Sequence, residues 1–198
     1  MLELVKPTAE RLPGFVDALR RGWSPDNTRH EAAIRHHLSR IERNPERFIV
    51  DQDDPEARGG DITLPDGTRA ARLPGFHLWM WDGEFCGTLG ARWSPGTTDL
   101  PPHCLGHVGY AVVPWKRRRG YATAALGLVM PRLRALGLPF IELTTDADNL
   151  PSQRVILANG GRLVRSFDKP ASFGGGKGLL FQLDLLPARM LAEPGAEA

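Results

Sequence analysis

The chain has 198 residues, of which 41% are hydrophobic and 24% are charged. These values are typical of one globular domain that buries a full-sized core. The formal net charge is only +2, which gives no case for bulk binding of nucleic acid. No apolar run approaches the ~20 residues that a membrane-spanning helix needs. We therefore expect one domain over residues 1–198 that binds neither nucleic acid nor a membrane.

The N-terminal segment and the cysteines indicate the compartment. Residues 1–15 carry acidic side chains early and lack a continuous apolar stretch, which argues against a secretory signal. Two cysteines, Cys86 and Cys104, are too few for a disulfide framework or a zinc site. The adjacent pair His36-His37 has no partner at metal-ligand spacing. We expect a cytoplasmic protein with reduced thiols and no metal.

Helical patterns occupy the first part of the chain. Apolar residues recur at helical spacing over residues 9–23 and again over residues 29–43, where Thr28 is the expected N-cap. In residues 44–74, Gly59-Gly60 and Pro65-Asp66-Gly67 predict turns around a short ribbon. A connection of this length is often functional. An insertion without chemistry is an equally good interpretation.

The rest of the chain alternates strands and helices. Asp82-Gly83 lies between two apolar, aromatic runs, 76–81 and 85–93, and predicts a β-hairpin. Trp79 and Trp81 share one face of its first strand, which favours a place in the core or in a cleft wall. The further predicted elements are strands 108–113, 140–145, 161–167 and 179–185, helices 120–136 and 152–158, and a flexible tail over residues 188–198. Their order gives a mixed, mostly antiparallel α/β fold.

The most informative segment is His107 to Thr123, which reads HVGYAVVPWKRRRGYAT. A strand-like run ends at Pro114, and the basic run Arg117-Arg118-Arg119 then leads into an alanine-rich helical pattern. A helix start offers free N–H groups and a positive dipole end to a phosphate. Gly120 lets the backbone approach such a ligand closely, and the arginines add charge-assisted contacts. The alternative is a solvated basic turn.

This segment resembles the acyl-coenzyme A signature of the GCN5-related N-acetyltransferase (GNAT) superfamily, Arg/Gln-x-x-Gly-x-Gly/Ala. The matching residues are Arg117, Gly120 and Ala122 in the signature, Asn149, Ser152 and Asn159-Gly160-Gly161 downstream of it, and Gly106-His107-Val108-Gly109-Tyr110 upstream. The upstream part is similar to the G-H-x-G-Y of a predicted bacterial branch. The match covers about residues 106–163. It implies a mixed, mostly antiparallel central sheet that is splayed at the acyl-CoA site and flanked by helices.

The resemblance implies acetyl-CoA as the acyl donor. Backbone N–H groups of the signature loop would bind the pyrophosphate, the arginines would meet phosphate oxygens, and the pantetheine arm would pair with the signature strand. The residues that the resemblance assigns to this binding are Val112, Val113, Arg117, Arg118, Arg119, Gly120, Tyr121, Ala122, Thr123, Asn149 and Ser152. The alternative for Asn149 is a local helix cap.

Acetyl transfer to an amine also needs a proton acceptor. Where members of the family often carry a glutamate as general base, this chain has His107, and a neutral imidazole is a competent base near pH 7. The alternative for His107 is a packing or hydrogen-bonding role. Glu142 on the adjacent strand is the second candidate, and its alternative is a solvated strand face.

The chain departs from the family at the group that protonates the departing thiolate. The position that commonly holds a tyrosine is Ile156, which carries no proton to donate. Ser152 or a water would then take this role, or the thiolate leaves without a protein acid. A thiol with a pKa near ~8.5 is a tolerable leaving group.

The sequence therefore favours an acetyl-CoA-dependent N-acetyltransferase that moves the acetyl group directly to an amine of a small molecule or a peptide. A first alternative is a non-catalytic acyl-CoA-binding sensor, which the missing tyrosine and glutamate favour. A second is a nucleotide- or nucleic-acid-binding domain, against which the near-neutral charge argues. The identity of the acceptor stays open, and a homodimer is common in the family.

Overall fold

The computed structural model describes residues 1–26, 28–64 and 67–185. The strands are β1 (Glu3–Val5), β2 (Asp53–Asp54), β3 (Ile62–Thr63), β4 (Arg69–Ala70), β5 (Gly75–Trp81), β6 (Phe85–Arg92), β7 (Val108–Val112), β8 (Phe140–Asp146), β9 (Arg162–Asp168) and β10 (Lys177–Asp184). The helices are α1 (Leu12–Arg20), α2 (His30–Arg43), α3 (Pro45–Val50), α4 (Tyr121–Arg134) and α5 (Leu150–Ala158), with 3-10 turns η1 (Pro114–Lys116) and η2 (Ala171–Phe173).

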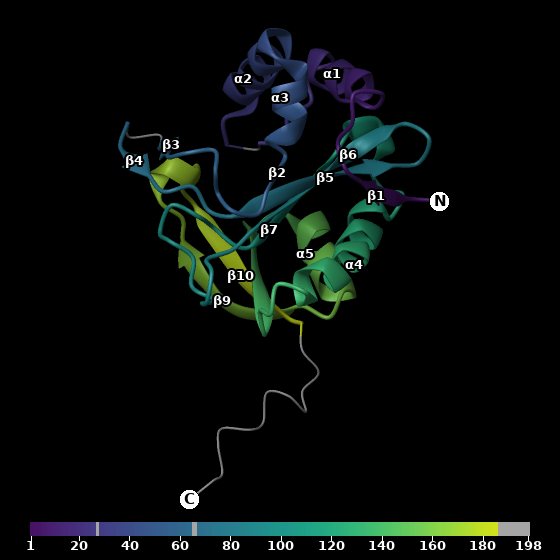
Figure 1. The fold of residues 1–198 in the computed structure, drawn as a ribbon. Coiled ribbons are helices and arrows are strands. Elements are labelled where there is room, and N and C mark those ends of the chain that lie inside the picture. The colour runs from purple at the N-terminus through teal and green to yellow at the C-terminus, as the bar shows by residue number, and fades with distance from the viewer. Residues whose placement is uncertain (27, 65–66, 186–198) are drawn as a thin grey trace, which may run out of the picture.

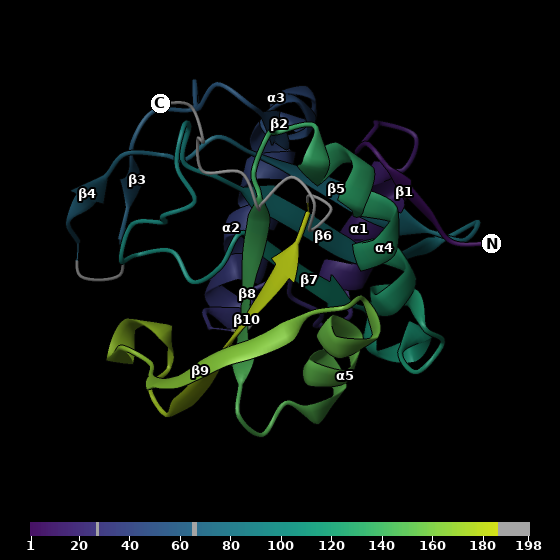
Figure 2. The ribbon, with the colours of Figure 1, turned by 90° about the horizontal axis from the view of Figure 1, so that it is seen from below.

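The strands form two main sheets, shown in Figures 1 and 2. One has the order β1-β5-β6-β7, with β2 also pairing with β5, and the other has the order β8-β10-β9. Every pairing among the described strands is antiparallel. The mixed α/β fold class predicted from the sequence is confirmed.

Helices cover both sides of the first sheet (Figure 1). On one side, α1 and α3 bury Phe15 and Phe48 against Trp79 of β5, whose ring stacks on that of Phe15 at a centroid distance of 5.2 Å. On the other side, α4 packs its apolar face against the alternate residues of the same strand, such as Met80. The alternation of side chains along β5 therefore supplies both cores, and Trp79 lies in the core as predicted.

The two sheets meet at one point and separate beyond it. The backbone N–H of His107 donates to the carbonyl of Glu142 over 2.7 Å, immediately before β7 begins. From Val108 to Val112, β7 pairs with β6 on one side and is the last strand of its sheet on the other. The edges of β7 and β8 thus bound a wedge that is closed at His107 and Glu142 and open toward α4. We call this the strand wedge.

The structure corrects the sequence predictions in the first third of the chain. Helix α3 was not predicted, although Asn44 caps it by accepting a hydrogen bond from the N–H of Arg47, and a proline follows that cap. The N-cap of α2 is Arg29 without a side-chain bond, so Thr28 does not cap it. The short ribbon is present as β3 paired with β4. The predicted tail, residues 188–198, lies outside the described residues.

Candidate active site

The start of α4 leaves its first N–H groups without a side-chain acceptor. Its N-cap is Gly120, which has φ of +75° and no side chain to cap the helix. The carbonyl of Gly120 accepts from the N–H of Ala124, so the N–H groups of Tyr121, Ala122 and Thr123 precede the helical ladder. This end of α4 has the partial positive charge and the free donors of an anion site.

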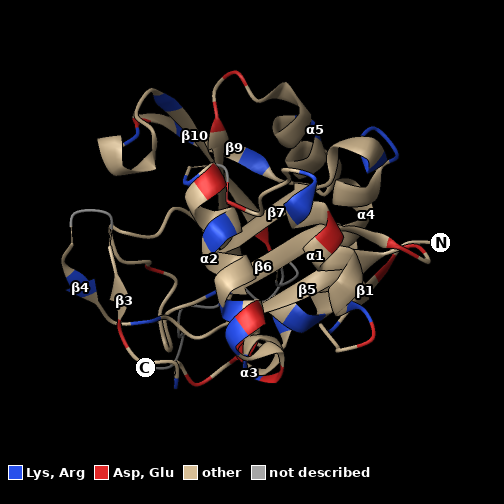
Figure 3. Ribbon diagram, turned by 90° about the horizontal axis from the view of Figure 1, so that it is seen from above, with Lys and Arg blue, Asp and Glu red and all other residues tan. Residues whose placement is uncertain are grey.

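The loop before α4 carries the three arginines, where Figure 3 shows blue ribbon beside the start of the helix, and all three are exposed. Arg118 has φ of +62°, a left-handed conformation that is uncommon for a residue with a Cβ. Arg117 donates from Nε to the carbonyl of Val112 over 3.2 Å. Within the described chain, none of the three arginines forms an ion pair. Their charge is therefore free for an anionic ligand.

Val112 and Val113 lie at the open end of the strand wedge but differ in their backbone contacts. The N–H of Val113 donates to the carbonyl of Cys86 on β6. Because backbone groups of an antiparallel strand alternate in direction, Val112 directs its N–H and carbonyl away from β6. Of the two, the structure leaves Val112 on the edge that faces the wedge.

His107 closes the wedge from a buried position. Its side chain is only 1% exposed, and Nδ1 accepts a hydrogen bond from the N–H of Glu142 over 3.0 Å. Burial, with the nearby positive charge of Arg92, lowers the pKa of His107 to about 4. The imidazole is therefore neutral at pH 7, and the lone pair of Nδ1 is engaged in a bond within the protein.

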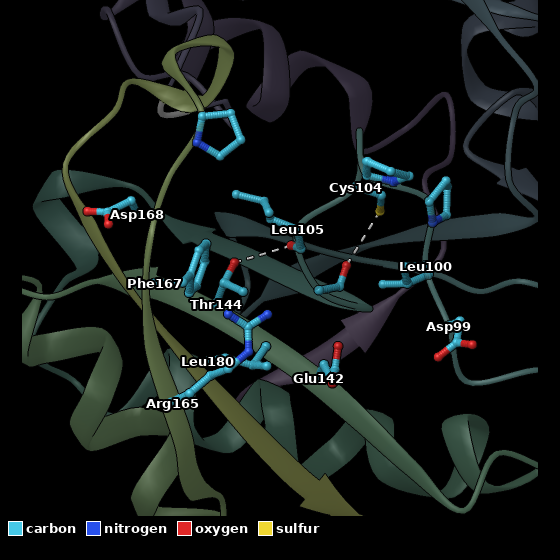
Figure 4. A pocket seen from close by; sticks show the side chains of 14 residues that line it. Asp99, Leu100, Cys104, Leu105, Glu142, Thr144, Arg165, Phe167, Asp168 and Leu180 are labelled. Carbon is cyan, nitrogen blue, oxygen red and sulfur yellow. Dashed lines mark hydrogen bonds between the residues drawn. The ribbon is translucent and has the colours of Figure 1, made fainter.

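Glu142 turns its side chain into a pocket on the face of β8 opposite α5 (Figure 4). The pocket has a volume of about 470 Å³ and is bounded by the loop between β6 and β7 and by β8, β9 and β10. Glu142 lies between Arg165 and Asp99 in Figure 4, and no described residue forms a hydrogen bond or ion pair with its carboxylate. Burial raises the pKa of Glu142, and Arg165 partly offsets this effect.

The start of α5 brings three polar side chains together. Asn149 caps the helix, with its carbonyl oxygen accepting from the N–H of Ser152 over 3.1 Å. The hydroxyl groups of Ser152 and Tyr110 are hydrogen-bonded over 2.9 Å. Ile156, at the position of the family's usual tyrosine, is 1% exposed and lies in the core.

Sequence reasoning missed Tyr110, Asp99 and Arg165 as members of the site. Tyr110 meets Ser152 across 42 positions of the chain, and Arg165 reaches the pocket from β9. No spacing rule connects residues on separate strands, so only the sheet topology brings them together. The one local signal was the phase of β7, since Tyr110 lies two residues before Val112 and shares its face.

The comparisons with known proteins follow this geometry. The sequence profile of the family described as the acetyltransferase (GNAT) family matches residues 32–160. The chain belongs to the GNAT acetyltransferase family. The match includes the strand wedge, the basic loop and α5, so the resemblance seen in the signature is confirmed. No curated protein sequence matches this GNAT chain.

Solved structures of low sequence identity share its fold. One is the microcin C7 self-immunity acetyltransferase MccE in complex with acetyl-CoA and AMP, at a TM-score of 0.62, 11% identity and 92% coverage of both chains. RimJ of Mycobacterium smegmatis, in complex with CoA-disulfide, has a TM-score of 0.59 and 20% identity, and the match covers 97% of this chain and 84% of RimJ. RimL, a ribosomal L7/L12 α-N-protein acetyltransferase in complex with CoA, has a TM-score of 0.59 and 14% identity, and the match covers 92% of this chain and 93% of RimL.

Within the residues that the structure describes, no group of three or more His, Cys, Asp or Glu side chains is arranged to hold a metal ion. None of the described helices is long and apolar enough to cross a membrane.

Proposed function

We propose that this GNAT chain is an acetyl-CoA-dependent N-acetyltransferase that moves the acetyl group directly from the thioester to an amine. The observation that carries the proposal is the uncapped start of α4, which lies beside three arginines that form no ion pair with any described residue, at the open end of the strand wedge. Free N–H groups and exposed positive charge suit a pyrophosphate. An exposed strand edge suits a linear arm that carries amide groups.

The dimensions of the wedge support this placement of the donor. The four steps from Val112 back to Val108 span about 13 Å of strand. With the pyrophosphate at α4, the pantetheine arm would run along β7 toward the closed end of the wedge. The thioester would then lie near Glu142.

Glu142 is the better candidate for the general base. Its carboxylate enters the pocket without a partner among the described residues, and its raised pKa makes it a stronger proton acceptor. His107 has the lone pair of Nδ1 engaged and a pKa lowered to about 4, which suits a structural role. In the proposed reaction the amine nitrogen attacks the thioester carbon, the C–N bond forms, the C–S bond breaks, and Glu142 takes the amine proton.

The departing thiolate needs a proton from another group. The hydroxyl pair of Tyr110 and Ser152 lies between β7 and α5 and replaces the tyrosine that Ile156 cannot supply. Burial raises the pKa of Tyr110, so its hydroxyl stays protonated at neutral pH. We propose that this pair, through Ser152 or Tyr110, returns a proton to the sulfur.

The cysteines support direct transfer over a covalent enzyme intermediate. Burial and the carboxylate of Asp82 raise the pKa of Cys86 to about 12, and burial raises that of Cys104. A nucleophilic cysteine must be a thiolate, which neither residue is near neutral pH. The double variant Cys86→Ala/Cys104→Ala is therefore expected to keep its activity.

The second candidate function is a non-catalytic sensor of acyl-CoA, which the isoleucine at position 156 favours. One experiment separates the two functions. CoA binding is measured by isothermal titration calorimetry, and release of free thiol from acetyl-CoA is followed with a panel of amino acids, polyamines and peptides with free N-termini. Amine-dependent thiol release supports the transferase. Tight CoA binding without release across the panel supports the sensor, and absence of CoA binding contradicts both.

A further inference from the structure

One carboxylate holds both ends of the basic loop. Asp82, in the turn between β5 and β6, accepts hydrogen bonds from Nζ of Lys116 at 3.0 Å to each oxygen. The same carboxylate accepts from the hydroxyl of Tyr121 over 2.5 Å. Lys116 ends η1 and Tyr121 begins α4, so the two contacts enclose residues 117–120.

The contact between Asp82 and Lys116 is shielded from water. Their side chains are 13% and 11% exposed, whereas in each of the other ion pairs among the described residues at least one partner is a quarter or more exposed. These hydrogen bonds, with that from Tyr121, hold the pKa of Asp82 well below its usual range despite the burial. The carboxylate is therefore charged throughout the neutral range, and its hydrogen bonds are charge-assisted.

The loop enclosed by these contacts needs such restraint. Arg118 has a left-handed backbone conformation, with φ of +62°, which is uncommon for a residue with a Cβ. A strained backbone persists only where its surroundings fix it. The arginines themselves form no ion pair with described residues, so the loop is held from its two ends while its charges stay free.

We propose that Asp82 is a positioning residue for acyl-CoA: it fixes the basic loop and the start of α4 in the shape that receives the pyrophosphate, without touching the ligand. This inference rests on the proposed function, because it takes the pyrophosphate of CoA as the ligand of the loop. It assigns the hairpin turn, far from the signature in sequence, a role in donor affinity. Lys116 and Tyr121 act through Asp82 as the two arms of this clamp.

The test compares a ligand that has the pyrophosphate with one that lacks it. Asp82→Asn is expected to weaken CoA binding about tenfold in isothermal titration calorimetry, because charge-assisted bonds to both ends of the loop are weakened. Binding of pantetheine, followed by NMR titration, is expected to stay within about twofold. A merely structural role would weaken both ligands together.

Glu84→Gln is the matched control, because Glu84 lies in the same turn and contacts Lys116 at 3.0 Å, but its side chain is 76% exposed and does not join Lys116 to Tyr121. It is expected to leave CoA affinity within about twofold. Should Asp82→Asn fail to fold, Tyr121→Phe and Lys116→Met remove the two arms separately, and each is expected to weaken CoA binding selectively. If the wild type binds CoA and these variants bind it with the same affinity, the inference is overturned and the proposed function stands. If the wild type binds no CoA, the proposed function is overturned as well.

Discussion

The basic loop and the Glu142 pocket are built in opposite ways. The loop is one continuous segment, and its binding groups are largely backbone N–H groups, a helix end and neighbouring arginines. The pocket is assembled from side chains of the β6–β7 loop and three strands, among them Asp99, Glu142 and Arg165. The difference teaches that the proposed donor site of this chain is a local structure, whereas the proposed acceptor site depends on the arrangement of the whole second sheet.

The largest expected effect tests the pocket alone. Glu142→Gln keeps the shape of the side chain but removes the base, so kcat is expected to fall about 100-fold or more, with CoA affinity unchanged. Steady-state thiol release and calorimetry measure the two quantities. Asp168→Asn is the matched control, since Asp168 lines the same pocket but pairs with Lys177 over 2.8 Å. An unchanged kcat in Glu142→Gln would show that Glu142 is not the general base.

The next effect tests the loop alone. Replacing Arg117 and Arg119 together with alanine is expected to weaken CoA binding by about 10- to 100-fold, because the two exposed charged contacts together contribute about 1.4–2.8 kcal/mol. Raising the salt concentration should shrink the difference between variant and wild type. Arg43→Ala, on the exposed surface of α2, serves as the control. Equal CoA affinity in all three proteins would contradict the assignment of the loop.

The contact between His107 and Glu142, which joins the two sheets, makes the stability of the protein depend on pH. The folded-state pKa of His107 is lowered to about 4, below the usual value of 6.5, so the unfolded chain binds more protons between these values. Stability is therefore full above pH 6.5 and falls as the pH drops toward 4.

His107→Asn keeps an acceptor near the position of Nδ1 but does not titrate. As the pH falls through this window, the free energy of unfolding of the variant, measured by thermal unfolding, is expected to drop by about 1.4 kcal/mol less per pH unit than that of the wild type. His37 and His77, whose pKa values are also lowered to about 4, should leave a residual slope in both proteins. Parallel pH profiles for variant and wild type would show that His107 does not contribute.

The smallest effect concerns the thiolate. Tyr110→Phe and Ser152→Ala are each expected to lower kcat by about three- to tenfold, because a thiolate also leaves without full protonation. The KM for acetyl-CoA should change little. Because the two hydroxyls form one hydrogen-bonded unit, the double variant should be no slower than the slower single variant. Fully additive losses would show that they act separately.

The same contrast decides how much the sequence could predict. The segment around Arg117 and Gly120 was predictable because a strand, a basic turn and an alanine-rich helix follow each other directly. The β5–β6 hairpin was predictable from Asp82-Gly83 in the same way. Pocket residues such as Arg165 were not, because strand order is set by long-range packing. His107 was recognised as special, but the side toward which it turns depends on where β8 lies.

Glu142 contributes its backbone and its side chain to different structures. Its N–H and carbonyl bond to His107 and join the two sheets, while its carboxylate enters the pocket. Substitutions at position 142 change the carboxylate in the pocket and keep the backbone contact with His107. Substitutions at position 107 change the contact between the sheets and keep the carboxylate. In the proposed enzyme, proton transfer and sheet geometry therefore meet at one residue, yet substitutions at the two positions separate them.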